Sequence, residues 1–232
     1  LGKKTLEMEL AFYASISRRD IVEEMKEILW HFFGEVPIQF VTSPWAIFKV
    51  LGNMVNPEEG FILVDVGGEI SEVYLIRGHI LEEVRAFANG GNSILRHLAS
   101  ALKVDMSEAL SFLRVKSRGE LKPSLDEKMS LVTAAACKSW EETFSEILAD
   151  MSKLHPLPRT LVLLGGAAGI DALRRCVGSE KLAPFTVLGK SFEVLTLLPE
   201  NITQKIDSKL LDQSDPQMTL PLLLILAASN YA

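Results

Sequence analysis

The chain has 232 residues, of which 48% are apolar and 23% are charged, so it can bury a core and is too apolar to be disordered. The formal net charge is −6, and the 24 Lys and Arg residues are spread along the sequence without a basic block. This distribution excludes the electrostatic pattern of a nucleic-acid-binding protein. The longest apolar run, residues 220–228, is too short for a membrane span and predicts a buried helix.

Residues that could support classical enzyme chemistry are few and scattered. The four histidines show neither a Ser-His-Asp order nor the spacing of zinc ligands. Cys137 and Cys176 lie in segments that we expect to be helical, and they also lack the spacing of metal ligands. We interpret the two cysteines as reduced packing residues of a cytoplasmic protein rather than as a disulfide. The sequence thus predicts no catalytic side chains.

Strands and helices are expected to alternate along the chain, which is typical of an α/β protein. Periodicity and turn residues first predict a strand, a helix, a second strand and a second helix, at 5–16, 17–34, 36–41 and 43–57. Three apolar strands follow and are predicted to form an antiparallel meander, at 61–66, 73–77 and 80–87.

The rest of the chain is predicted to be mainly helical. After a helix at 94–102, capping boxes predict helices that begin at Asp105, with Glu108 as partner, and at Ser124, with Glu127 as partner. The second of these is the longest, and its single apolar stripe is expected to face the core. The remaining elements are a strand at 161–164, a helix at 169–177, a strand at 185–188, an irregular polar stretch at 200–217 and an apolar helix from residue 219.

The first glycine-rich motif is Asp65-Val66-Gly67-Gly68-Glu69-Ile70-Ser71-Glu72. A strand that ends in Asp and is followed by glycines in a hairpin can hold phosphate, because glycine lets backbone N–H groups approach the anion. The Asp side chain can hold a metal ion or the water bound to it. An ordinary hairpin with glycine at its special backbone angles is the alternative interpretation.

The second glycine-rich motif is Val162-Leu163-Leu164-Gly165-Gly166-Ala167-Ala168-Gly169. Here a buried strand leads through a Gly-Gly turn into the N-terminus of a helix, whose dipole favours negative charge. The alternative is a turn that needs glycine only for its backbone shape.

The order of these parts is uncommon: an Asp-x-Gly-Gly hairpin, a glycine pair before a helix, a long helix and a strand-Gly-Gly-helix. In this order the chain resembles the actin-like ATPase superfamily, and within it the FtsA and PilM proteins of bacterial cell division and type IV pilus assembly. FANGGNSILRHLASAL is similar to the glycine pair and following helix of that family, DMSEALSFL to the next helix, and VLLGGAAGI to the adenosine-binding motif. The resemblance covers residues 17–231, and Arg85 is slightly more like PilM.

The resemblance implies an α/β fold, namely an actin-like ATPase (ribonuclease H-like) domain with a mixed sheet flanked by helices. Residues 1–232 would form one such unit, rich in the second half of the fold. Within it, residues 61–232 would be the nucleotide-binding half, and residues 1–60 a remnant of the first half or a connecting segment.

The resemblance also implies a site for ATP and Mg²⁺. Asp65 would face the metal, and Gly67 and Gly68 would approach the β- and γ-phosphates. Gly165 and Gly166 would lie against the nucleoside.

The long helix carries three further candidates. Lys138, with Glu141 or Glu142, matches the place where such proteins have a basic and an acidic residue near the ribose and adenine. A solvated helix face is the alternative interpretation of these three residues.

The hairpin departs from the family pattern, in which Gly-Thr-Thr-Asp usually stands where this chain has Glu69-Ile70-Ser71-Glu72. Glu69 places a carboxylate where phosphate charge would come, which is repulsive. Ile70 removes a hydroxyl that could bind phosphate, whereas Ser71 keeps one. Nothing in residues 1–15 resembles the other phosphate loop of the family, so that subdomain is either cut off or absent. We therefore expect weak binding of ATP and Mg²⁺ and at most a weak ATPase.

Together these features predict a cytoplasmic actin-like scaffold or adaptor in cell division or type IV pilus assembly. Weak ATP binding would control its self-association or its docking to a division-ring protein or to the tail of a pilus membrane protein. The chain would reach the inner membrane only through such a partner, without inserting directly. The alternatives are a small-molecule kinase of the same superfamily and a nucleotide-free interaction module. Phe12 and Ala14 are expected to lie in the self-association contact.

Overall fold

The computed structural model describes residues 14–51, 55, 59–78, 80–203 and 215–229 of the chain. One five-stranded sheet forms its centre, with strand order β3-β2-β1-β4-β5. The strands are β1 (Phe61–Val66), β2 (Ser71–Arg77), β3 (Ile80–Phe87), β4 (Thr160–Leu164) and β5 (Glu193–Thr196). β1, β2 and β3 form an antiparallel meander, whereas β4 and β5 run parallel to β1. The predicted meander and the mixed α/β sheet are thus confirmed.

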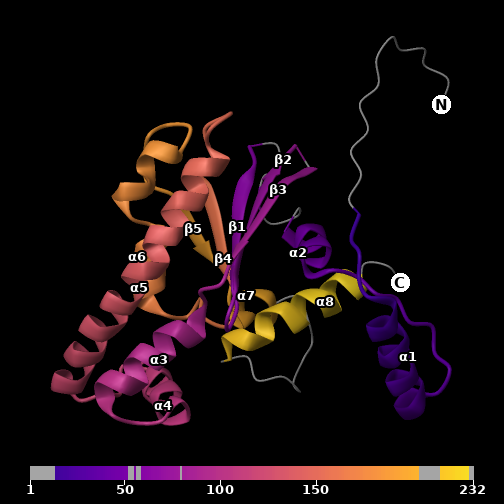
Figure 1. Cartoon of the computed structure of the whole chain (residues 1–232), viewed down its shortest axis with the longest axis horizontal. Coiled ribbons are helices and arrows are strands. Elements are labelled where there is room, and N and C mark those ends of the chain that lie inside the picture. Colours follow the sequence, from indigo (N-terminus) through magenta and orange to yellow (C-terminus); the bar gives the residue numbers. More distant parts are fainter. Residues whose placement is uncertain (1–13, 52–54, 56–58, 79, 204–214, 230–232) are drawn as a thin grey trace.

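Helices cover both faces of this sheet (Figure 1). The helices are α1 (Arg19–Phe33), α2 (Ser43–Leu51), α3 (Gly91–Leu102), α4 (Met106–Ser117), α5 (Pro123–Met151), α6 (Asp171–Val177), α7 (Pro199–Thr203) and α8 (Thr219–Ser229), with the short 3-10 helices η1 (Glu180–Phe185) and η2 (Pro216–Met218). One core lies between the sheet and α5 and α6, and a second lies between the opposite face and α2 and α8. A third, smaller core joins α3 and α4 to α5.

The central strand β1 explains why the two cores form. Ile62, Val64 and Val66 lie in the core beneath α5, whereas Phe61 and Leu63 lie in the core beneath α8. A strand that is buried on both faces needs apolar residues at nearly every position. Asp65 is the exception, and it stands near the end of the strand, where the chain turns.

The predicted apolar stripe of the long helix faces the core. Trp140, Phe144 and Leu148 of α5 are fully buried, and the Trp140 and Phe144 rings stack with centroids 4.8 Å apart. The helix begins at Pro123 after Lys122, without a side-chain cap, so the predicted Ser124 capping box is wrong. Proline is favoured at the first helical position, where its missing N–H costs nothing.

The Asp105 cap is confirmed, since its Oδ1 accepts a hydrogen bond from the Glu108 backbone N–H at 2.8 Å. Helix α1 begins at Arg19, after Arg18, which is later than the predicted start at residue 17.

Two of the predicted strands are absent from the structure. Residues 36–41 are not a strand, because no described strand lies beside them to complete a ladder. Residues 185–188 are not a strand either, because η1 ends at Phe185 and the chain then turns through Gly189, whose φ is +59°. The edge strand forms later, as β5. Of the predicted strand 5–16, residues 1–13 lie outside the described residues, and residues 14–16 are exposed and irregular.

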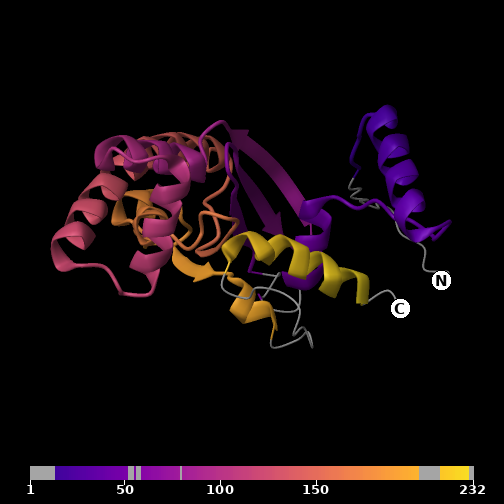
Figure 2. The same ribbon diagram turned by 90° about the horizontal axis from the view of Figure 1, so that it is seen from below.

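Helix α1 stands apart from the sheet in both views (Figures 1 and 2). None of its residues is buried. Its apolar side chains Ile21, Met25, Ile28 and Phe32 are all exposed and follow helical spacing along one stripe. We call these four residues the α1 stripe.

The core beneath α5 can be tested with one pair of substitutions on that helix. Phe144→Ala should lower the free energy of unfolding by about 3–5 kcal/mol, because it leaves a cavity next to Trp140. Leu131→Ala, at a position 68% exposed on the same helix, should change it by less than about 0.5 kcal/mol. Urea unfolding followed by tryptophan fluorescence measures both, and equal losses would contradict the packing described here.

Candidate functional site

The two glycine-rich turns meet at one edge of the sheet. β1 and β4 are neighbouring parallel strands, and Asp65 is paired with Leu164 in register. Both strands therefore end, and their turns begin, at the same end of the sheet. Gly165 has a φ of +99°, and a Cβ added there would lie 2.4 Å from Asp65 Oδ1 and 2.5 Å from the Val66 carbonyl oxygen. Only glycine therefore fits at this position. Asp65 is the last residue but one of the central strand β1 and lies beside the second turn.

The tip of the β1–β2 hairpin is fastened to the start of α3. The Gly91 N–H donates to the Gly67 carbonyl at 2.9 Å, and the Asn92 N–H donates to the Gly68 carbonyl at 2.8 Å. A Cβ at Gly90 would lie 2.5 Å from the Gly68 oxygen, so the close approach requires glycine. These bonds occupy first-turn N–H groups of α3 that would otherwise be free to bind an anion.

Glu69, expected to repel phosphate as a bare carboxylate, is instead neutralised within the chain. Arg96 of α3 donates from Nη1 to Oε1 at 2.9 Å and from Nη2 to Oε2 at 3.0 Å, and Asn92 Nδ2 donates to Oε1 at 2.9 Å. The hydrogen bonds from Arg96, then those from Asn92, lower the Glu69 pKa to about 2. Arg96 was not predicted as a partner of Glu69, because it lies 27 residues further along the chain, on another element.

Asp65 lines an open pocket of about 280 Å³ together with Gly67, Gly68, Glu69, Ile70 and Glu72. Asp65 and Glu72 are directly opposite each other in the β1–β2 ladder. Burial, and then the Glu72 charge, raise the Asp65 pKa to about 6. The residues that line this pocket include no cationic side chain beside Asp65 and Glu72. The pocket therefore favours a cation or a cation-bound ligand over a bare anion.

Ser71, expected to offer a hydroxyl to phosphate, faces the core. Its hydroxyl donates to the Asn89 carbonyl at 2.6 Å and accepts a hydrogen bond from Trp140 Nε1 at 2.9 Å. The side chain is fully buried beneath α5. Ser71 thus ties β2 to α5 and does not line the pocket.

The second glycine turn lies beneath the segment that precedes α8. A Cβ at Gly166 would lie 3.2 Å from Gln217 Cγ, and a Cβ at Gly169 would lie 3.2 Å from Pro216 Cγ. Asp215 forms an ion pair with Arg114 of α4 at 3.0 Å. These contacts bring α4 and η2 to the place where the sequence predicts a nucleoside. The polar side chains involved, Arg114, Asp215 and Gln217, were not among the predicted site residues.

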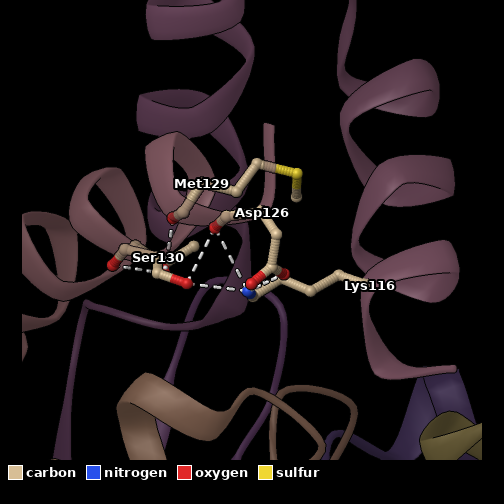
Figure 3. Close-up of polar contacts among 5 residues, drawn as sticks. Lys116, Asp126, Met129 and Ser130 are labelled. Carbon is tan, nitrogen blue, oxygen red and sulfur yellow. Dashed lines mark hydrogen bonds and ion pairs between the residues drawn. The ribbon is translucent and has the colours of Figure 1, made fainter. Parts of the chain in front are cut away.

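Helix α4 is held in turn against the start of α5 (Figure 3). Lys116 Nζ is 2.7 Å from Ser130 Oγ and also donates to the Asp126 carboxylate and backbone oxygen. Because Lys116 and Arg114 share α4, this cluster fixes the helix whose Arg114 pairs with Asp215, next to Pro216 and Gln217.

None of the three candidates on α5 lines the pocket beside Asp65. Glu141 accepts a hydrogen bond from Lys181 of η1 at 3.3 Å, and Lys138 and Glu142 are exposed. Their role near a ribose or adenine remains a prediction.

Among the described residues, no group of three or more His, Cys, Asp or Glu side chains is arranged to hold a metal ion. Within the same residues, no helix is long and apolar enough to cross a membrane.

No model of a known protein family matches the sequence, and no curated protein matches it either. Solved structures do match. A PilM–PilN type IV pilus biogenesis complex is 20% identical with a TM-score of 0.64, over 90% of this chain and 58% of the other. A MamK double helical filament is 16% identical with a TM-score of 0.57, over 94% and 67% of the two chains. Ta0583, an archaeal actin homolog, is 15% identical with a TM-score of 0.54, over 84% and 56%.

This chain therefore has an actin-like fold, and the expected likeness to PilM is confirmed at the level of the fold. The chain spans 58% of the PilM–PilN chain it matches, a little over half.

The electrostatics of Asp65 give a test of the pocket. Because its pKa is raised to about 6, the folded chain binds this proton more tightly than the unfolded chain does. The resulting stabilisation is complete below the unfolded pKa and is lost as the pH rises from about 4 to about 6. Asp65→Asn should therefore raise the free energy of unfolding above about pH 7, by about 3 kcal/mol at most, and should change it little below about pH 4.

Urea unfolding of both proteins across this pH range measures the effect. Glu72→Gln removes only the smaller cause of the shift, so its gain at neutral pH should be smaller than that of Asp65→Asn. An Asp65→Asn protein no more stable than the parent at neutral pH would contradict this account.

Proposed function

We propose that this chain is part of a cytoplasmic actin-like scaffold or adaptor for cell division or type IV pilus assembly, and that it binds Mg²⁺-ATP weakly. The observation that carries the proposal is the contact between the two glycine turns, where Gly165 leaves no room for a Cβ beside Asp65. Ordinary turns need no such approach, whereas a nucleotide site needs an acidic side chain and bare backbone together.

In this proposal Asp65 holds Mg²⁺, Gly67 and Gly68 approach the phosphates, and Gly165 and Gly166 approach the nucleoside. The ion would offset the charges of Asp65 and Glu72, which otherwise repel phosphate. The Gly67 N–H already donates to the Ile70 carbonyl at 3.0 Å, so one backbone donor is lost to the hairpin itself. We expect a Kd above roughly 0.1 mM, or about −5.5 kcal/mol.

The nucleotide-free interaction module remains the second candidate. The packing of Pro216 and Gln217 over the second turn favours it, because a nucleoside would have to displace them. Calorimetric titration with ATP and Mg²⁺ separates the candidates: binding without turnover supports the scaffold, turnover with an added sugar supports a kinase, and no heat supports the module.

Residues 61–232 would be the nucleotide-binding half, and α1, which stands apart from the sheet, would belong to a remnant of the first half. Helix α2 packs against α8 in the second core, so this part of residues 1–60 is joined to the nucleotide-binding half.

Protein partners are proposed from the α1 stripe. Two copies of this chain could cover the stripe isologously, each helix covering the other, which would remove the apolar surface from water. One similar structure is a filament and another is a complex with a protein partner. Attachment to the inner membrane would come only through such a partner.

The phosphate end of the site is tested by Glu69→Gly with Ile70→Thr. The double substitution releases the Arg96 guanidinium from Glu69 and restores a hydroxyl, so ATP binding should tighten by about tenfold or more, about 1.4 kcal/mol. Adding Arg96→Ala should abolish most of that gain, because the freed guanidinium supplies it. Titration calorimetry in Mg²⁺ measures all three variants, and unchanged affinity in the double variant would contradict the assignment.

Self-association is tested by a charge in the α1 stripe. Met25→Glu should weaken a dimer by about tenfold or more, because the carboxylate would be buried against the partner copy. Glu24→Gln, at the neighbouring exposed position, is the matched control and should leave association unchanged. Sedimentation at micromolar concentration gives the result, and a parent chain that is monomeric throughout would refute the proposal. The expected contact residue Phe12 lies outside the described residues, and Ala14 is exposed.

A further inference from the structure

The two cysteines of the chain lie against each other, although 39 residues separate them. Cys137 is buried on α5, and Cys176 is half-buried on α6, so α6 presents the more accessible sulfur. The Cys176 Sγ lies 4.0 Å from the Cys137 backbone oxygen, to which its thiol donates. Both are free thiols in this structure.

The packing of α5 on α6 makes this arrangement rigid. Both helices belong to the core beneath the sheet, where Trp140 on one side and Leu173 on the other are fully buried. Because the Cys176 sulfur reaches the backbone of Cys137, the two side chains are close enough to be candidates for a disulfide.

From this juxtaposition we propose that Cys137 and Cys176 form a redox-active thiol pair, which a hydroperoxide converts reversibly into a disulfide between α5 and α6. The oxidation of this pair does not require nucleotide binding at the proposed site.

The charges around the pair favour attack by Cys176. The hydrogen bond from the Cys137 thiol, with the cations Lys181 and Arg175, lowers the Cys176 pKa against the opposing effects of burial and Glu141. The same hydrogen bond, together with burial, raises the Cys137 pKa, so that thiol stays protonated. A thiolate is the nucleophile in such reactions, and Cys176 is therefore the attacking residue.

The chemistry is balanced with hydrogen peroxide as oxidant. The Cys176 thiolate sulfur attacks one peroxide oxygen, the O–O bond breaks, and a sulfenic acid and hydroxide form. The Cys137 sulfur then attacks the sulfenic sulfur, the S–O bond breaks, and the Cys137 proton leaves with the departing hydroxide as water. The two thiols lose two electrons and two protons in total, and the peroxide is reduced to two waters.

The disulfide would affect the second glycine turn, because it would hold α6, the helix that follows that turn. This helix follows directly on the second glycine turn, whose Gly165 contacts Asp65. Joining α6 to α5 would fix the far end of that turn.

The test is peptide mapping of the folded, full chain after treatment with hydrogen peroxide. Trypsin cleaves after Lys128, Lys138, Arg175 and Lys181, so the disulfide would link peptides 129–138 and 176–181. We expect the intact mass to fall by two hydrogen atoms, the linked peptides to appear, and a dithiol reductant to reverse both changes. The oxidised chain should also have a higher urea midpoint than the reduced chain, because the bond restricts the unfolded chain.

Variants at each cysteine separate the roles. Oxidation of the Cys137→Ser variant should stop at a Cys176 sulfenic acid, which a dimedone probe traps. The Cys176→Ser variant should resist oxidation. Cys137→Ala replaces the first variant if circular dichroism shows that it does not fold. Three outcomes would overturn the proposal: a Cys176 sulfinic acid without a linked peptide, linkage only in urea-unfolded protein, or a lower urea midpoint on oxidation.

Discussion

The site depends on the parallel pairing of β1 with β4. This pairing brings two turns that are about a hundred residues apart in sequence to one sheet edge, where Asp65 stands opposite Leu164. Because the turn after β4 must pass within contact distance of the Asp65 carboxylate, Gly165 takes a positive φ and has no side chain. The buried carboxylate in turn has a raised pKa, so the same contact that assembles the site also weakens the fold at neutral pH.

The second constraint is the attachment of the hairpin tip to α3. Two backbone hydrogen bonds and the Glu69–Arg96 pair perform this role together. A hairpin that used these groups to bind an anion would need an alternative anchor. Here the N–H groups, the guanidinium and the amide of Asn92 are all directed at the chain itself. The hairpin is thus rigid and pre-shaped, yet it has few donors to offer a phosphate.

Sequence reasoning was most successful where one segment determines its own structure. The strands around Asp65, the Asp105 cap and the α5 stripe follow from local pattern and were predicted correctly. The strand predicted at 36–41 is absent, because a strand forms only beside a neighbouring strand and the local sequence pattern does not supply one. Within the site, Asp65 and the glycines could be found from turn chemistry. Arg96, Arg114 and Gln217 could not, because each acts on a residue far away in sequence and an isolated polar side chain gives no signal.

A nucleotide bound as proposed would meet unequal costs at the two ends of the site. At the nucleoside end, displacing η2 would break the Arg114–Asp215 pair, which is partly exposed and so worth about 0.2–1 kcal/mol. At the phosphate end, the ligand meets the Asp65 and Glu72 carboxylates and a hairpin whose donors are already used. Like charges a few ångströms apart at a partly buried site cost about 4 kcal/mol at an effective dielectric constant near 20. For a nucleotide bound as proposed, the phosphate end would therefore carry the larger electrostatic cost, which the Mg²⁺ ion would have to offset.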